Sequence, residues 1–461
     1  MNNKAPAAVE ELLQVTLQQL QHPNISVLSF PLLSEVAQKR YLYILKEEMK
    51  GICLVLLIAV IVESDNHDDG ISEDNKELSE EELKEILAQL NMHFAVNIYK
   101  QVASSALKEK NSEPKNIFFS PVSISTSLAM LALGAKAETR HQILNSLAPK
   151  ETPIQEVKIH NAFKHLLQTL NKPKKDLKIT VGNAAFVEEE LKFLKSFAHE
   201  AERYYQADVF STNFKNPKDA EIQINNYVNN QTNGKIKELV RGPSMDTKLL
   251  LVNYILFKGE WESPFSPDFT RLSVFSIDNR TKVEVKMMSR MGRFDIFLDN
   301  ELPCTVLKLP YIDDALMLLI MPELGKIQEV EAALSKDTIL RWRNSTSKKF
   351  LRLYMPKFSI SSSLKLKEIL SDVGMSNIFS DQADFSGIVE DGKLTLSKVI
   401  HKAVLDVDEK GTEAAAVTAV NVIRYSLLKS QKVDRPFLVV ICSKQTDTIL
   451  FMGRIVNPTE K

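Results

Sequence analysis

A run of strand-forming residues near the C-terminus is the part of this chain best suited to chemistry. Residues 408–423 read DEKGTEAAAVTAVNVI and are followed by Arg424, Tyr425 and Ser426. Because side chains alternate between the two faces of a strand, one face would be small and apolar while the other would carry Glu413 and Asn421. The first face consists of Thr412, Ala414, Ala416, Thr418, Val420 and Val422. It contains no charge, so the run predicts a strand that can be added to a sheet.

The same run has a second interpretation. Glu413 followed by three alanines also suits a helix, and short apolar runs do not distinguish a strand from a helix. The residues of the run alone therefore leave both structures open.

The surrounding sequence resembles a known family. Residues 402–416, KAVLDVDEKGTEAAA, resemble the hinge of the reactive-centre loop of inhibitory serpins. From about Leu87 to Lys461, further segments resemble serpins in the family's order and spacing, namely 116–123, 251–259 with Trp261, 397–403, 434–437 and 451–454. The chain is thus identified as a member of the serpin family, of the antitrypsin and antichymotrypsin type.

The helices and strands that must position this loop are not evenly alternated along the chain. Helical patterns come early and strand patterns come late, which favours an α+β fold over repeated βαβ units. The serpin resemblance implies about nine helices around three β-sheets, with an exposed reactive-centre loop at about 409–432. The spacing of Leu83, Ile86, Leu87, Leu90, Phe94 and Ile98 predicts an amphipathic helix that opens the folded domain. The expected helices further along are 94–107, 125–133, 138–147 and 159–170, and the expected late strands are 249–257, 304–309, 316–321, 351–356, 437–441 and 448–451.

The resemblance implies a suicide inhibitor of a serine protease and not an enzyme, with no catalytic group and no cofactor of its own. The serine of the protease attacks a loop peptide bond and forms an acyl-enzyme. The segment from Gly411 then inserts into the main sheet as a new strand and distorts the attached protease, so the native state is metastable. The 15 residues from Gly411 to Tyr425 extend over roughly 50 Å, enough to cross such a domain.

The family register places the reactive bond at Tyr425–Ser426. A tyrosine that enters an apolar specificity pocket favours a chymotrypsin-like protease as the partner. Arg424 leaves open a trypsin-like target, if the protease cleaves one residue earlier.

The residue types of the hinge distinguish inhibitory serpins from their non-inhibitory relatives. A flexible glycine and small residues allow rapid strand insertion, and no proline occurs between this glycine and Pro436. The competing hypothesis is a hormone or ligand carrier of the same fold, and such carriers typically have a degraded hinge. The hinge residues are Glu409, Gly411, Thr412, Glu413, Ala414, Ala415 and Ala416.

Several polar residues belong, by resemblance, to the region of the main sheet that opens for insertion. Lys357 would pair with Glu409 beside Trp261 at the top of the sheet and restrain premature opening. His401 is interpreted as a hydrogen-bonded core histidine and not as a catalytic base or metal ligand. The region under the sheet comprises Ser120, Ser123, Asn253 and His401.

The N-terminal part predicts secretion. Residues 49–64 contain a short apolar run behind Lys50 that resembles a signal peptide, because a membrane span needs about 20 apolar residues. Residues 1–48 would then be an alternative or non-native extension, the other interpretation being an intracellular domain in which the run is a buried strand. Residues 65–86 predict an acidic disordered tail, and residues 87–461 the serpin domain.

The composition of the chain limits which other partners and sites are expected. The chain has 58 basic and 59 acidic residues, so no overall charge indicates a nucleic-acid partner. Its three cysteines cannot form a disulfide scaffold, no metal-binding spacing occurs, and Cys304 and Cys442 are expected to be buried apolar residues. Sequons at Asn230, Asn279 and Asn344 fit a secreted, glycosylated, extracellular protein. We expect a monomer without a membrane partner.

Two clusters of basic residues suggest a further partner, a glycosaminoglycan. Heparin-like polyanions accelerate several serpins through such patches, although scattered solvated lysines are the simpler explanation here, because neither set is long or interleaved to form a groove. Glycosaminoglycan binding is therefore kept as an alternative for Lys172, Lys174, Lys175 and Lys178, and for Lys348, Lys349 and Arg352.

Overall fold

The computed structural model describes residues 78–108, 115–149, 154–345, 347–364, 366–390, 394–411 and 429–460. These ranges belong to one compact unit that begins at Leu78. The predicted N-terminal extension and signal peptide lie outside the described residues, as do residues 412–428 of the reactive-centre loop.

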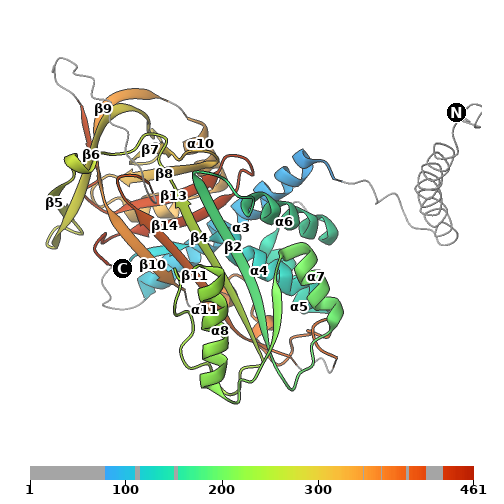
Figure 1. Cartoon of the computed structure of the whole chain (residues 1–461). Helices are drawn as coiled ribbons and strands as arrows, with labels where there is room; N and C mark the ends of the chain where they lie inside the picture. Colours follow the sequence, from blue (N-terminus) through green and yellow to red (C-terminus); the bar gives the residue numbers. More distant parts are fainter. Residues whose placement is uncertain are drawn as a thin grey trace, which may run out of the picture. The chain divides into compact units, whose positions relative to one another are not determined.

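The described ranges contain nine α-helices, and the four predicted helices fall inside the first four of them (Figure 1). The helices are α3 (Glu80–Lys108), α4 (Pro121–Gly134), α5 (Ala137–Leu147), α6 (Glu156–Leu170), α7 (Lys195–Tyr205), α8 (Pro217–Gln231), α9 (Ile327–Ala332), α10 (Lys336–Asn344) and α11 (Leu366–Asp372).

The start of α3 corrects the predicted acidic tail, which was wrong from residue 80 onward. The Ser79 hydroxyl accepts the N–H of Glu82 at 3.3 Å, and the Glu82 carboxylate accepts the N–H of Ser79 at 2.8 Å. This reciprocal capping box satisfies two N–H groups at the helix start, and three glutamates in the first turn suit the positive end of the helix dipole. The acidic residues from Glu80 to Glu82 therefore belong to the N-terminus of a helix.

In the part of the chain that the structure describes, the strands form two hydrogen-bonded sheets. One has the order β10-β11-β4-β2-β3, and the other has the order β1-β14-β13-β8-β7-β6-β9-β12 with β5 paired to β6. The strands are β1 (Ile117–Phe119), β2 (Leu177–Glu188), β3 (Asp208–Thr212), β4 (Leu249–Gly259), β5 (Arg271–Ser276), β6 (Lys282–Leu298), β7 (Cys304–Pro310), β8 (Ala315–Pro322), β9 (Lys348–Pro356), β10 (Phe358–Ser363), β11 (Leu396–Val407), β12 (Ser430–Lys432), β13 (Phe437–Ser443) and β14 (Ile449–Ile455).

The third strand set that the resemblance implies is continuous with the larger sheet. The long strand β6 pairs with β7 near its C-terminal end and with β9 and β5 over the rest of its length. One strand thus belongs to both sets. The predicted α+β class and the predicted late strands are confirmed.

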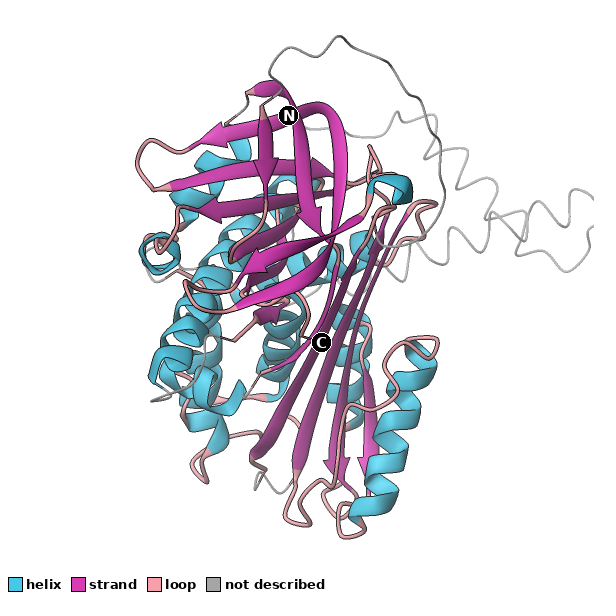
Figure 2. Cartoon of the chain, turned by 90° about the vertical axis from the view of Figure 1, so that its left-hand side faces the viewer, coloured by secondary structure: helices cyan, strands magenta, loops and turns pink. Residues whose placement is uncertain are grey.

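Helices cover both faces of the five-stranded sheet (Figures 1 and 2). Helix α8 lies on one face, here called the front face, where Ala220, Ile224 and Val228 pack against β2, β4 and β11. Helix α4 contacts β2 and β4 from the opposite, back face. The two faces therefore belong to separate hydrophobic clusters.

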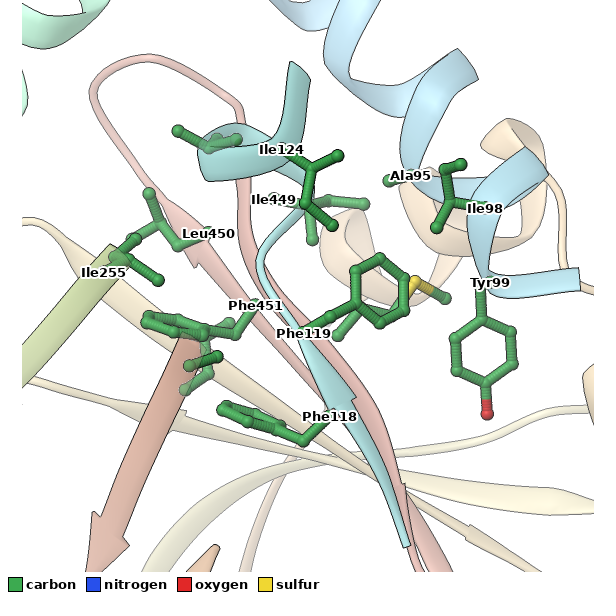
Figure 3. Packing of buried hydrophobic residues seen from close by; sticks show 14 of the residues in the cluster. Ala95, Ile98, Tyr99, Phe118, Phe119, Ile124, Ile255, Ile449, Leu450 and Phe451 are labelled. Carbon is green, nitrogen blue, oxygen red and sulfur yellow. The ribbon is translucent and has the colours of Figure 1, made fainter. Parts of the chain in front are cut away.

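The main core joins the back face to the larger sheet (Figure 3). Phe118 of β1 stacks on Phe451 of β14 with ring centroids 5.2 Å apart, and Ile255 of β4 belongs to the same cluster. Cys304 and Cys442 are buried and free, as predicted.

Candidate functional site

Two interior strands of the five-stranded sheet, β11 and β4, are parallel neighbours. Strand β11 pairs with β4 in parallel register, with His401 opposite Asn253 and Val404 opposite Leu256. The boundary between these two strands is called the seam below. Strand β11 ends at Val407, and the chain then passes directly into residues 408–411, called the loop root.

A tight turn forms the loop root. The N–H of Asp408 donates to the carbonyl of Gly411 at 3.0 Å, and the N–H of Gly411 donates back to the carbonyl of Asp408 at 3.3 Å. Gly411 has φ +123°, and a Cβ atom at this position would lie 2.3 Å from the carbonyl oxygen of Gly259. Both the backbone conformation and the space require glycine here.

Hydrogen bonds hold the loop root against the segment that follows β4. Trp261 donates twice to the root, from its backbone N–H to the Lys410 carbonyl and from its indole N–H to the Asp408 carbonyl, each at 3.0 Å. The N–H of Phe265 donates to the Glu409 carbonyl at 2.7 Å. The Trp261 ring stacks on the buried ring of Tyr311 at 4.2 Å, which fixes its position.

A charged contact closes the root on its other side. The Lys357 ammonium lies 2.8 Å from one Glu409 carboxylate oxygen, and the Thr270 hydroxyl donates to the other at 2.7 Å. Burial opposes ionisation of Glu409, but the bonds from Lys357 and Thr270 outweigh it, so the pKa of Glu409 is lowered. Lys357, Glu409 and Trp261 therefore lie together at the place that the sequence predicts.

Under the seam, His401 connects the two strands to helix α4. Its Nε2 accepts the backbone N–H of Ser120 at 3.0 Å, so Nδ1 carries the proton and donates to Asn253 Oδ1 at 2.5 Å. The Ser123 hydroxyl donates to the same Asn253 oxygen at 3.0 Å. Ser120 also caps α4, whose first residue is Pro121. The structure places the four predicted residues in one buried network.

A neighbouring pair is not apparent from the sequence. The Ser127 hydroxyl donates to Asn183 Oδ1 at 2.8 Å, and Asn183 on β2 stands opposite Asn253 on β4. The Nδ2 groups of both asparagines are buried without a hydrogen-bond partner in the described ranges. This pair therefore lies beside the network on a third strand, because the strand register places Asn183 opposite Asn253.

Residues 89–458 match the family model described as Serpin (serine protease inhibitor). The chain belongs to the serpin family. Serpin A3-7 of Bos taurus is 47% identical over 377 residues, which cover 81% of this serpin and 89% of the relative. Alpha-1-antiproteinase S of Cavia porcellus is 43% identical over 369 residues, which cover 80% of this serpin and 90% of the relative. These two relatives confirm the predicted antitrypsin and antichymotrypsin branch.

A solved structure agrees with the fold. Human thyroxine-binding globulin aligns with a TM-score of 0.77 at 41% identity, covering 82% of this serpin and 100% of that chain. Within the described ranges, no helix is both long enough and apolar enough to cross a membrane.

The predicted glycosylation sites of this serpin lie on its surface. Asn230 is exposed near the C-terminal end of α8, Asn279 is exposed in the turn between β5 and β6, and Asn344 lies at the end of α10. Thr346, the third residue of the last sequon, lies outside the described residues. Glycosylation at these positions stays a prediction.

The two basic sets lie on different elements. Lys172, Lys174 and Lys175 precede β2, which contains Lys178, and Lys174 pairs with Asp314 at 3.3 Å. The second set, Lys348, Lys349 and Arg352, lies on β9. Glycosaminoglycan binding by either set stays a prediction from the sequence.

The His401 network predicts a pH dependence of stability. Burial lowers the pKa of His401 to about 3, so the folded protein keeps this ring neutral while the unfolded chain protonates it below about pH 6.5. The contribution of the neutral His401 ring to the free energy of unfolding is complete above pH 6.5. It falls by about 1.4 kcal/mol per pH unit as the pH decreases toward 3.

We therefore expect His401→Gln to be less stable than the wild type at pH 7.5, with the difference shrinking at lower pH. The comparison requires denaturant midpoints of both proteins between pH 4.5 and 7.5. Parallel pH profiles of the two proteins would show that His401 does not titrate in this way.

Proposed function

We propose that this serpin is a secreted suicide inhibitor of a chymotrypsin-like serine protease. The protease attacks the Tyr425–Ser426 bond, and the acyl-enzyme is trapped when the loop inserts between β4 and β11. Secretion rests on the predicted signal peptide at residues 49–64 and on the three surface sequons. The family description, serine protease inhibitor, supports the class of target.

The parallel seam is the observation that carries this proposal. Because β11 leads directly into the loop root, a chain that turns back at residues 408–411 would run antiparallel to both β11 and β4. Insertion would replace one parallel ladder with two antiparallel ladders, and antiparallel pairing is slightly more stable per residue. The sheet would therefore gain backbone hydrogen bonds if the loop inserted as a strand between β4 and β11.

The length of the hinge segment suits this seam. Strand β11 has 12 residues, and the 12 residues 412–423 would extend over about 40 Å. Their alternating small side chains need little space when they enter a packed sheet. Backbone contacts of the root, the Lys357–Glu409 pair and the His401 network hold the sheet closed until cleavage frees the loop.

The deciding experiment uses chymotrypsin and trypsin. We expect chymotrypsin to give a complex that survives denaturing electrophoresis and a released peptide that begins at Ser426. Tyr425→Ala should slow complex formation about 10- to 100-fold, because an aromatic ring no longer fills the apolar pocket. Arg424→Ala is the matched control and should leave the rate with chymotrypsin nearly unchanged.

Other outcomes point to the alternatives. A peptide that begins at Tyr425 would identify Arg424 as the specificity residue and a trypsin-like target. Cleavage without any complex would favour a carrier, a role for which the structure of thyroxine-binding globulin with thyroxine is the relevant precedent. Mass spectrometry of the same secreted material also gives its N-terminus, and a start before Met49 would contradict the predicted signal peptide.

A further inference from the structure

A groove lies on the front face of the five-stranded sheet, beyond the C-terminal end of α8. Helix α8 covers one part of this face and ends at Gln231. The residues that follow, Thr232, Asn233 and Lys235, line one side of a half-open groove of about 850 Å³, and Pro458 near the C-terminus lines another. Small-molecule sites commonly have volumes of about 300–1,000 Å³.

The floor of this front groove has an apolar row. Thr180 of β2 stands opposite Leu256 of β4, and Leu256 stands opposite Val404 of β11. These side chains alternate with those of the back face, so they continue the surface on which α8 packs. Leu256 and Val404 are half-buried at the edge of the α8 cluster. The apolar part of the floor therefore spans the seam.

A cationic row borders the apolar one. Lys178 stands opposite Lys258 two residues further along the same strands, and Lys235 and Lys286 approach from the α8 loop and from β6. Lys178, Lys235 and Lys286 make no ion pair with other described residues. Lysines that lack a counter-charge favour binding of an anion.

Acidic residues at the rim offset part of this charge. Five lysines and three acids line the groove. Asp406 accepts a hydrogen bond from the Ser359 hydroxyl at 2.5 Å, and Asp408 accepts the N–H of Lys410 at 2.9 Å. The third acid, Glu284, is exposed on β6. Because Lys357 is already paired with Glu409, the remaining lysines outnumber the acids by one, so the groove keeps a small positive excess beside an apolar floor.

We propose that the front groove binds an amphipathic anion, with an apolar body on Leu256 and Val404 and an anionic group among Lys178, Lys235 and Lys286. The groove borders the loop root, because Asp408 and Lys357 line it as well.

Occupancy of the groove is coupled to the state of the sheet. An inserted strand would move β4 and β11 from one strand spacing apart to two, an increase of about 4.8 Å, and would divide Leu256 from Val404. The anion therefore binds the uninserted sheet only. By linkage, bound anion slows loop insertion, and insertion releases the anion. This coupling rests on the proposed function, whereas the binding itself does not.

The binding is tested with 8-anilinonaphthalene-1-sulfonate as the probe, by fluorescence titration of the intact protein. We expect saturable binding at one site, weakened about tenfold in the double variant Lys178→Glu/Lys235→Glu. The charge-matched control Lys192→Glu/Lys336→Glu changes two lysines outside the groove and should bind as the wild type does. Equal affinity of the two double variants would overturn the site.

The coupling is tested on the loop-cleaved, uncomplexed fraction of the same protein. Insertion is monitored separately as a rise in the heat stability of the cleaved protein. We expect the heat-stable cleaved form to bind the probe at least about tenfold more weakly than the intact form. Equal affinity in a heat-stabilised cleaved protein would overturn the coupling. A cleaved protein with no gain in heat stability would overturn the proposed function instead, while the lysine variants would still decide the binding.

Discussion

Replacing Ala416 with proline is expected to convert this serpin from the proposed inhibitor of chymotrypsin into a substrate. In the inserted strand, residue 416 would lie within the ladders to β4 and β11, where proline has no N–H to donate. A buried acceptor left without its donor costs about 1–3 kcal/mol, which would slow insertion roughly 5- to 150-fold. Hydrolysis of the acyl-enzyme would then precede trapping. Denaturing gels would show cleaved protein in place of the covalent complex.

The matched control for this variant is Ala416→Ser. Serine keeps the backbone N–H and a small side chain, so the yield of complex should equal that of the wild type. If the proline variant formed as much complex as the serine variant, insertion past residue 416 would not be required for trapping, and the proposed mechanism would fail.

Glu409→Lys is expected to increase polymer formation. The substitution places two ammonium groups where the 2.8 Å contact with Lys357 now stands, and it removes the acceptor of the Thr270 hydroxyl. The Lys357 side chain is 40% exposed and that of Glu409 is 10% exposed, so the cost lies between those of surface and buried pairs, at about 1–3 kcal/mol. A loosened root would let the seam open and expose unpaired strand edges to another molecule. Native gels after mild heating measure the loss of monomer.

The charge-swapped double variant Lys357→Glu/Glu409→Lys separates charge from packing. It restores an ion pair in the same place, and the Thr270 hydroxyl can then accept a hydrogen bond from the introduced ammonium group. We expect the monomer to recover in part. Equal monomer in the wild type and in Glu409→Lys after heating would mean that the pair does not hold the root closed.

The root combines two kinds of contact with different roles. Three hydrogen bonds from Trp261 and Phe265 position residues 408–410, and the packed Trp261–Tyr311 stack makes them rigid. The Lys357–Glu409 pair adds a contact that can be lost without disturbing the core. In the proposed mechanism, the sheet stays closed until cleavage and then opens, and these contacts would serve as a fixed hinge and as a contact that is released.

Much of the fold could be predicted from local pattern. The helix that contains Phe94 and the strand that contains Leu251 were predicted because apolar periodicity depends only on neighbouring residues. A helix from about Leu83 was predicted, but the first residues of α3, Glu80 to Glu82, were taken as part of the disordered tail, although Ser79 and Glu82 have the spacing of a capping box. The continuity of β6 through both strand sets depends on long-range pairing, which no local pattern encodes.

The candidate site divides in the same way. The positions of Ser120, Ser123, Asn253 and His401 were predicted by resemblance, and the structure brings them together. Asn183 and Thr270 were not predicted, because each reaches the site through the register of a strand or the path of a loop. The reactive bond and the small hinge residues beyond Gly411 lie outside the described residues and stay predictions.

The sequence by itself determined the family, the α+β class and the small, uncharged hinge face, because these follow from residue types at fixed spacing. Only the tertiary structure decided that β11 and β4 are parallel neighbours, that Gly411 has no room for a side chain, and that a cationic groove crosses the seam. The physical reason is that spacing along the chain fixes which face a side chain takes. Which strands meet, and in what register, is set by the burial of apolar faces from distant parts of the chain.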